Sequence, residues 1–184
     1  MGPSLINREI LNSRLLHEKF DIDVLPINTS SSISSVERFS FKKLPVLAGK
    51  IFKLIGKLSG NKYEFAYFTL SVAGIGFLKD FLLVLILKLS GTKIIYHLHG
   101  KGISKSKNLF IKSCYRFCFK NEKVILLSEL LSADIKDYVK SSALDILPNG
   151  MQNVISDKEF NLLSEKRQET QEQTRLLFLA NMVR

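Results

Sequence analysis

Two histidines at the end of a predicted strand are the side chains best placed to do chemistry in this sequence. The segment 94–102 reads Ile-Ile-Tyr-His-Leu-His-Gly-Lys-Gly, which places His97 and His99 directly before Gly100. Doubly wound α/β folds bind ligands at the carboxyl ends of their parallel strands. His99 and Gly100 are therefore candidates for a ligand site. His97 either faces the same site or packs in the sheet, and a structural role stays open for a histidine in a strand.

Polar residues follow two further strand-like runs. Ser128 and Glu129 come directly after Lys-Val-Ile-Leu-Leu, at a second position that can face a ligand. Capping of the next helix explains Ser128 equally well. Asn149 and Gly150 follow the strand-like run at 143–147, and they form either a turn or a contact at the edge of the cleft.

The sequence predicts no metal site and no cofactor. Cys114 and Cys118 lie four residues apart in a predicted helix, where their sulfurs share a face without disulfide geometry. We interpret them as reduced core residues. With only three further nitrogen ligands, at His17, His97 and His99, no zinc-binding spacing is found.

The elements that must position these residues alternate regularly between strand and helix. Strands separated by helices in this order predict a parallel sheet with helices on both faces, a Rossmann-like α/β fold. Ser4 is expected to cap the first helix. The strands are expected at 22–27, 65–70, 93–98, 123–127, 143–147 and 175–180, and the helices at 4–20, 41–58, 77–89, 108–120 and 128–138.

The composition is that of a folded basic domain. Of 184 residues, 46% are hydrophobic, and 27 Lys and Arg against 17 Asp and Glu give a net charge of +10. This balance disfavours disorder and favours anionic partners such as nucleic acid, anionic lipid or a sugar nucleotide. The sequence shows no signal peptide, and its most apolar stretch, 77–89, falls short of the roughly 20 residues of a membrane span. We therefore expect a cytoplasmic protein.

A basic stripe is predicted on the helix at 41–58. Lys50, Lys53 and Lys57 recur at helical spacing. Such a stripe is either a solvated face opposite the core or a surface for anionic lipid, and the two interpretations are compatible.

Five sequence blocks together resemble a known family. They read YFTLSVAGIGFLKDFLLV, KIIYHLHGKGIS, KVILLSELLSADIKDYV, DILPNGM and RLLFLANMVR. In this order and spacing the chain resembles, over nearly its whole length, the N-terminal half of the retaining family-four (group 1) glycosyltransferases of the GT-B type. The resemblance implies a Rossmann-like acceptor-side domain at 1–155, a charged linker at 156–174 and the first strand of a donor-binding domain at 175–184.

The resemblance also implies roles for individual residues. The histidine that matches His99 faces the cleft and hydrogen-bonds to the transferred sugar, while Gly2 and Ser4 match a loop whose backbone amides approach the donor phosphates. The reaction it implies displaces a nucleoside diphosphate, whose charge is stabilised electrostatically without a metal ion. The chain begins inside that loop and ends before the donor-binding residues, so we expect the first strand to be missing and the fragment to be inactive alone.

Two functions follow as expectations. The first is transfer of a sugar from a nucleotide-sugar donor to a saccharide or lipid-linked acceptor in bacterial surface polysaccharide synthesis, at the inner face of the cytoplasmic membrane. The alternative is a basic module that binds nucleic acid or anionic membrane without catalysis. For nucleic acid, the sequence has neither zinc-finger spacing nor an aromatic RNA-binding signature, so charge alone supports it.

Overall fold

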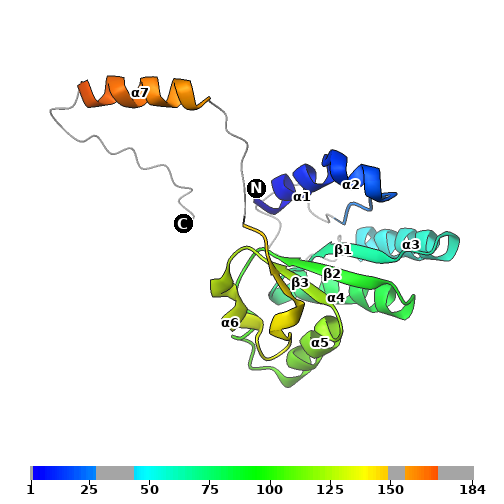
Figure 1. Cartoon of the computed structure of the whole chain (residues 1–184). Coiled ribbons are helices and arrows are strands. Elements are labelled where there is room, and N and C mark those ends of the chain that lie inside the picture. Colours follow the sequence, from blue (N-terminus) through cyan, green and yellow to red (C-terminus); the bar gives the residue numbers. More distant parts are fainter. Residues whose placement is uncertain (1, 28–43, 149–155, 170–184) are drawn as a thin grey trace. The chain divides into compact units, whose positions relative to one another are not determined.

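A computed structural model describes residues 2–27, 44–148 and 156–169 (Figure 1). Contacts divide the chain into two units, Met1–Asn149 and Gly150–Arg184. All four strands of the described chain lie in the first unit, and the second contains the helix α7 (Asp157–Glu169). The predicted domain limits at 155 and 174 stay predictions, and the strand expected at 175–180 lies outside the described residues.

The first unit is built on a parallel sheet in the order β1-β2-β3-β4. Adjacent strands are in register, so that Thr69 lies beside His97 and His97 beside Ile125. Helices surround this sheet, which confirms the α/β class (Figure 1). The strands are β1 (Phe65–Thr69), β2 (Lys93–Leu98), β3 (Lys123–Leu126) and β4 (Leu144–Ile146).

The connections between strands cover one face of the sheet. Right-handed crossovers between strands that are neighbours in sequence and space place all their helices on the same side. The helix α3 (Leu44–Gly60) precedes β1 and packs beside α4. The connecting elements are α4 (Gly74–Leu89), α5 (Leu109–Phe119), η3 (Glu129–Leu131), α6 (Ser132–Ile135) and η4 (Ser141–Ala143).

The hydrophobic core lies between this sheet face and its helices. Tyr96 of β2 is fully buried and its hydroxyl donates to the Cys118 carbonyl of α5 over 3.0 Å. The Phe77 ring of α4 lies 4.3 Å from the Tyr115 ring of α5, measured between centroids. Cys114 and Cys118 are buried, free thiols in this core, as predicted, and burial raises the pKa of Cys118 to about 12.

The opposite sheet face meets the N-terminal helix. Thr69 alternates with the core residue Phe68, so its side chain lies on the other face. Its hydroxyl donates to the Asn7 side chain of α1 (Gly2–Leu11) over 3.2 Å. Figure 1 accordingly shows α1 and α2 (Arg14–Lys19) across the sheet from α4 and α5.

The N-terminal segment differs from its prediction in two ways. The expected helix 4–20 is divided into α1 and α2 because Ser13 is extended. Since α1 begins at Gly2, Ser4 lies inside the helix and does not cap it.

The strand predicted at 22–27 is wrong, because this segment has no regular secondary structure. Pro26 lacks the N–H that a sheet ladder needs. Side-chain bonds hold the segment instead: both carboxylate oxygens of Asp23 accept hydrogen bonds from Lys57 over 2.5 Å, and one accepts from Tyr63 over 2.6 Å.

In the second unit, part of the charged segment forms the helix α7. At the start of α7 the Glu159 carboxylate accepts hydrogen bonds from the backbone N–H and the hydroxyl of Ser156, and the Ser156 hydroxyl accepts from the Glu159 N–H. This reciprocal capping box explains where the helix starts. No helix of the described residues is both long and apolar enough to cross a membrane.

Candidate functional site

The two predicted histidines meet at the carboxyl end of β2. His97 is the fifth residue of the strand and is fully buried, and His99 is partly buried just beyond the strand. Their ring centroids are 4.1 Å apart. The Tyr67 hydroxyl of β1 hydrogen-bonds to Nδ1 of His97, with the two rings edge to face at 5.8 Å between centroids. His97 therefore packs in the sheet, and its ring contacts that of His99.

Burial keeps both imidazoles neutral at pH 7. It lowers the pKa of His97 to about 4, with a smaller contribution from the neighbouring His99, and it also lowers the pKa of His99 below its usual value. A neutral imidazole carries one N–H donor and one bare nitrogen acceptor. The cluster can thus form hydrogen bonds in both senses, but it is a poor source of protons at neutral pH.

Three ring nitrogens of this cluster have no hydrogen-bond partner among the described residues. They are Nε2 of His97 and both Nδ1 and Nε2 of His99, and all three are buried atoms. Buried polar atoms in folded proteins nearly always have a partner, and each exception needs an explanation. Such a partner lies outside the described residues, as water, as a ligand or as another part of the protein.

The loop after His99 is fixed by a buried carboxylate that the sequence did not reveal. Asp134 is 3% exposed and accepts hydrogen bonds from the N–H groups of Gly102, Ile103 and Ser104 at 2.7, 2.9 and 3.1 Å, and from the Ser104 hydroxyl at 2.5 Å. Burial alone would raise its pKa, but these four bonds outweigh burial and lower it. Gly102 has a φ of +151°, which favours glycine.

A second loop, after β1, lies against the first. The Ser71 N–H donates to buried Asp80 over 2.8 Å, and the Tyr115 hydroxyl donates to the Val72 carbonyl over 2.6 Å. A Cβ on Gly100 would lie 3.4 Å from the Val72 side chain, an ordinary contact. The two loops therefore pack closely and together fix the surroundings of His99.

Of the other predicted site residues, Ser128 and Glu129 follow a strand of the sheet, and Gly2 and Ser4 lie in the N-terminal helix. The Ser128 hydroxyl accepts the Leu130 N–H over 3.3 Å, which confirms the capping interpretation, and Glu129 is exposed in the same turn after β3. The backbones of Gly2 and Ser4 belong to α1.

Asn149 and Gly150 lie outside the described residues. Their predicted roles, as a turn or as a contact at the cleft edge, are therefore not addressed by the structure. A role for Gly2 or Ser4 in binding phosphate also stays a prediction.

The three lysines of the predicted basic stripe on α3 differ in exposure and in pairing. Lys57 is paired with Asp23, so its charge is neutralised locally. Lys53 is exposed and Lys50 is partly buried. Lys57 is paired because a residue 34 positions earlier in the sequence folds back onto α3, and a role of the three lysines in binding anionic lipid stays a prediction.

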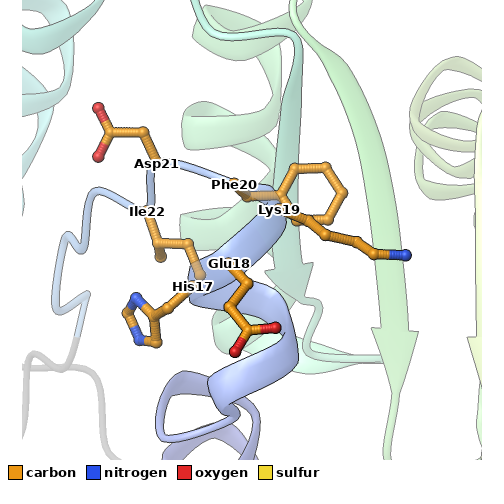
Figure 2. A pocket seen from close by; sticks show the side chains of 6 residues that line it. All are labelled: His17, Glu18, Lys19, Phe20, Asp21 and Ile22. Atoms are coloured by element: carbon orange, nitrogen blue, oxygen red, sulfur yellow. The ribbon is translucent and has the colours of Figure 1, made fainter.

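A surface hollow at the end of α2 is a weaker candidate (Figure 2). Six consecutive residues line it, and Figure 2 shows their side chains pointing in different directions. His17 is exposed, and its Nε2 lies 2.6 Å from the Leu11 carbonyl. No predicted site residue lines this hollow, so it has few features of a ligand site. The lining residues are His17, Glu18, Lys19, Phe20, Asp21 and Ile22.

Neither a metal site nor a relative identifies the chemistry. Within the described ranges, no three or more His, Cys, Asp or Glu side chains are grouped to hold a metal ion. Comparison of the chain with protein-family models, curated proteins and solved structures finds no match. The function must therefore be inferred from the geometry around His99.

Proposed function

We propose that the chain is the acceptor-side domain of a glycosyltransferase that uses a nucleotide-sugar donor, and that His99 hydrogen-bonds to a hydroxyl of the transferred sugar. The observation that carries the proposal is the state of His99. This imidazole is neutral, it lies at the carboxyl end of the second strand of a parallel sheet, and both its ring nitrogens lack partners among the described residues. Sugar hydroxyls both donate and accept, which matches a neutral imidazole.

In such a transfer the bond from the sugar C1 to the diphosphate breaks, and a bond from C1 to the acceptor oxygen forms. The nucleoside diphosphate leaves with the electron pair and takes up the proton that the acceptor hydroxyl loses. The lowered pKa of His99 makes it a poor proton donor at pH 7. Its role in the proposal is to orient the sugar, and the groups that bind the diphosphate are not assigned to residues of this chain.

The surroundings of His99 support an orienting role. Buried His97 packs against its ring, and Tyr67 fixes His97 by a hydrogen bond. Asp134 holds the loop that follows. A binding group held by packing and by further hydrogen bonds loses little freedom when ligand arrives.

A non-catalytic basic binding module is the second candidate. The observation that favours it is the net charge of +10 together with the exposed Lys53 on α3. The two candidates involve different residues. An electrostatic module would lose binding when lysines are neutralised, and it would keep binding when His99 is replaced.

The proposal is tested by calorimetric titration of the chain with UDP-glucose, GDP-mannose and methyl α-glucoside as probes. We expect His99→Ala to weaken binding of a bound probe about tenfold, which corresponds to the loss of one or two hydrogen bonds. His17→Ala is the matched control, since His17 is exposed on α2, and it should bind as the wild type does. No binding by the wild type, or equal binding by His99→Ala, would contradict the proposal.

A further inference from the structure

Apolar side chains are exposed along the outer side of the three helices that cover the core face of the sheet. Contacts place α4 between α3 and α5. Along α4 the exposed residues Ile75, Leu78 and Leu82 recur at helical spacing. Phe52 of α3 is 73% exposed and Phe110 of α5 is 65% exposed. Several exposed large apolar side chains on one layer of helices are typical of an interaction surface.

The charge on the same helices has a single sign at the surface. The three helices contain seven basic residues: three lysines in α3, two in α4, and a lysine and an arginine in α5. Their one acidic residue is Asp80, which is 1% exposed. The three helices therefore present no exposed carboxylate. A partner for this face must accept both apolar side chains and cations.

Some of these cations are already engaged. Lys57 pairs with Asp23, Lys79 with Asp80 and Lys88 with Glu122. The remaining four have no ion pair with any described residue, and Lys53 directly follows exposed Phe52. These four cations are Lys50, Lys53, Lys112 and Arg116.

We infer that the outer face of α3, α4 and α5 docks onto an anionic lipid bilayer. At the boundary between headgroups and acyl chains, apolar side chains leave water while lysines contact lipid phosphates. A nucleic acid would match the cations but leave the leucines of α4 exposed to water. The inference deepens the proposed function, since it names the surface where a lipid-linked acceptor would be met, but it does not depend on the chemistry of His99.

The chain offers a direct test because it contains no tryptophan. Phe52→Trp places a single fluorophore on the proposed face, and Phe20→Trp places one at an exposed position directly after α2, outside the three helices, as the matched control. With vesicles of phosphatidylglycerol and phosphatidylcholine, we expect the emission of Phe52→Trp to shift to the blue and to be quenched by brominated acyl chains. The emission of Phe20→Trp should stay that of a water-exposed indole.

Vesicle sedimentation separates the apolar from the ionic contribution. Lys50→Gln/Lys53→Gln should weaken binding about 25-fold, because each cation near an anionic bilayer contributes about a fivefold factor. Phe52→Ser/Leu78→Ser/Leu82→Ser should weaken it at least tenfold and leave its salt dependence in place. Leu15→Ser/Lys19→Gln, on exposed positions of α2, is the control that should bind normally.

Three results would overturn the inference. The first is failure of the wild-type chain to bind phosphatidylglycerol vesicles. The second is normal vesicle binding by the triple serine variant, which would reduce the surface to a generic polyanion site. The third is a dimer in light scattering that this variant abolishes, with no vesicle binding, which would make the face a contact between copies of the chain. None of these readouts involves sugar binding, so the lipid inference can fail while the His99 proposal stands.

Discussion

The histidine pair shows how burial determines the chemistry of single residues. His97 is fully buried against Tyr67 and His99, and its pKa falls to about 4. A cationic imidazole in that position would have to give up its hydration without gaining a carboxylate partner among the described residues. The pair is therefore suited to hydrogen bonding at neutral pH, which is the role proposed for His99.

The depressed pKa of His97 predicts how stability depends on pH. In the unfolded chain His97 binds a proton near pH 6.5, whereas in the folded chain it does so near pH 4. The contribution of neutral His97 to the free energy of unfolding is complete above pH 6.5. It is lost as pH falls to 4, because in that window the imidazole binds a proton only in the unfolded state. The free energy of unfolding decreases by about 3 kcal/mol over this range.

Urea unfolding at pH values from 7 to 4 measures this loss. In His97→Gln, where the side chain stays neutral, the free energy of unfolding should depend less on pH. In His17→Ala it should depend on pH as in the wild type. If His97→Gln does not fold, NMR titration of the wild-type ring gives the same information. A pKa of His97 near 6.5 in the folded protein would refute the prediction.

At the scale of elements, one carboxylate holds the loop between β2 and α5. The three backbone N–H groups bound by Asp134 would lose their acceptor if its side chain were removed, and that of Ile103 belongs to a fully buried residue. The loop contains the residues directly after His99, so its conformation determines the surroundings of the His99 ring.

Asp134→Ala is expected to destabilise the domain by roughly 2–4 kcal/mol, since four donors, among them the buried Ile103 N–H, would lose a charged acceptor. Hydrogen exchange at Gly102, Ile103 and Ser104 should accelerate along with this loss. Asp137→Ala, at an exposed position three residues later, should change the free energy of unfolding by less than about 0.5 kcal/mol. Unchanged exchange in the loop of Asp134→Ala would show that the carboxylate does not hold it.

The elements also show what sequence patterns can predict. The strand at 93–98 and the helix at 109–119 were expected almost to the residue, because apolar spacing reports burial locally. Asp134 was not expected as a loop anchor, since its partners are about 30 residues away and nothing near it in sequence marks the contact. The same limit applies to Lys57, whose partner Asp23 lies 34 residues away, and to Tyr67, whose contact with His97 depends on strand register.

At the scale of the whole molecule, the sheet separates two kinds of surface. The carboxyl edge carries neutral, buried polar groups around His99, and the outer face of α3, α4 and α5 carries exposed apolar and cationic groups. The parallel topology explains this division, because it gathers the strand ends at one edge and the crossover helices on one face. This division matches the two proposals, which place a polar ligand at the carboxyl edge and a lipid surface at the outer face of these helices.

The most direct test of the central claim is a long-range ¹H–¹⁵N NMR spectrum of the three histidine rings at pH 7, recorded while UDP-glucose is added. The account predicts that His99 is neutral before addition and that its ring nitrogens shift as the probe binds, while those of His17 stay unchanged. A His99 ring that is cationic at pH 7, or whose nitrogens do not respond up to the solubility limit of the probe, would contradict the account.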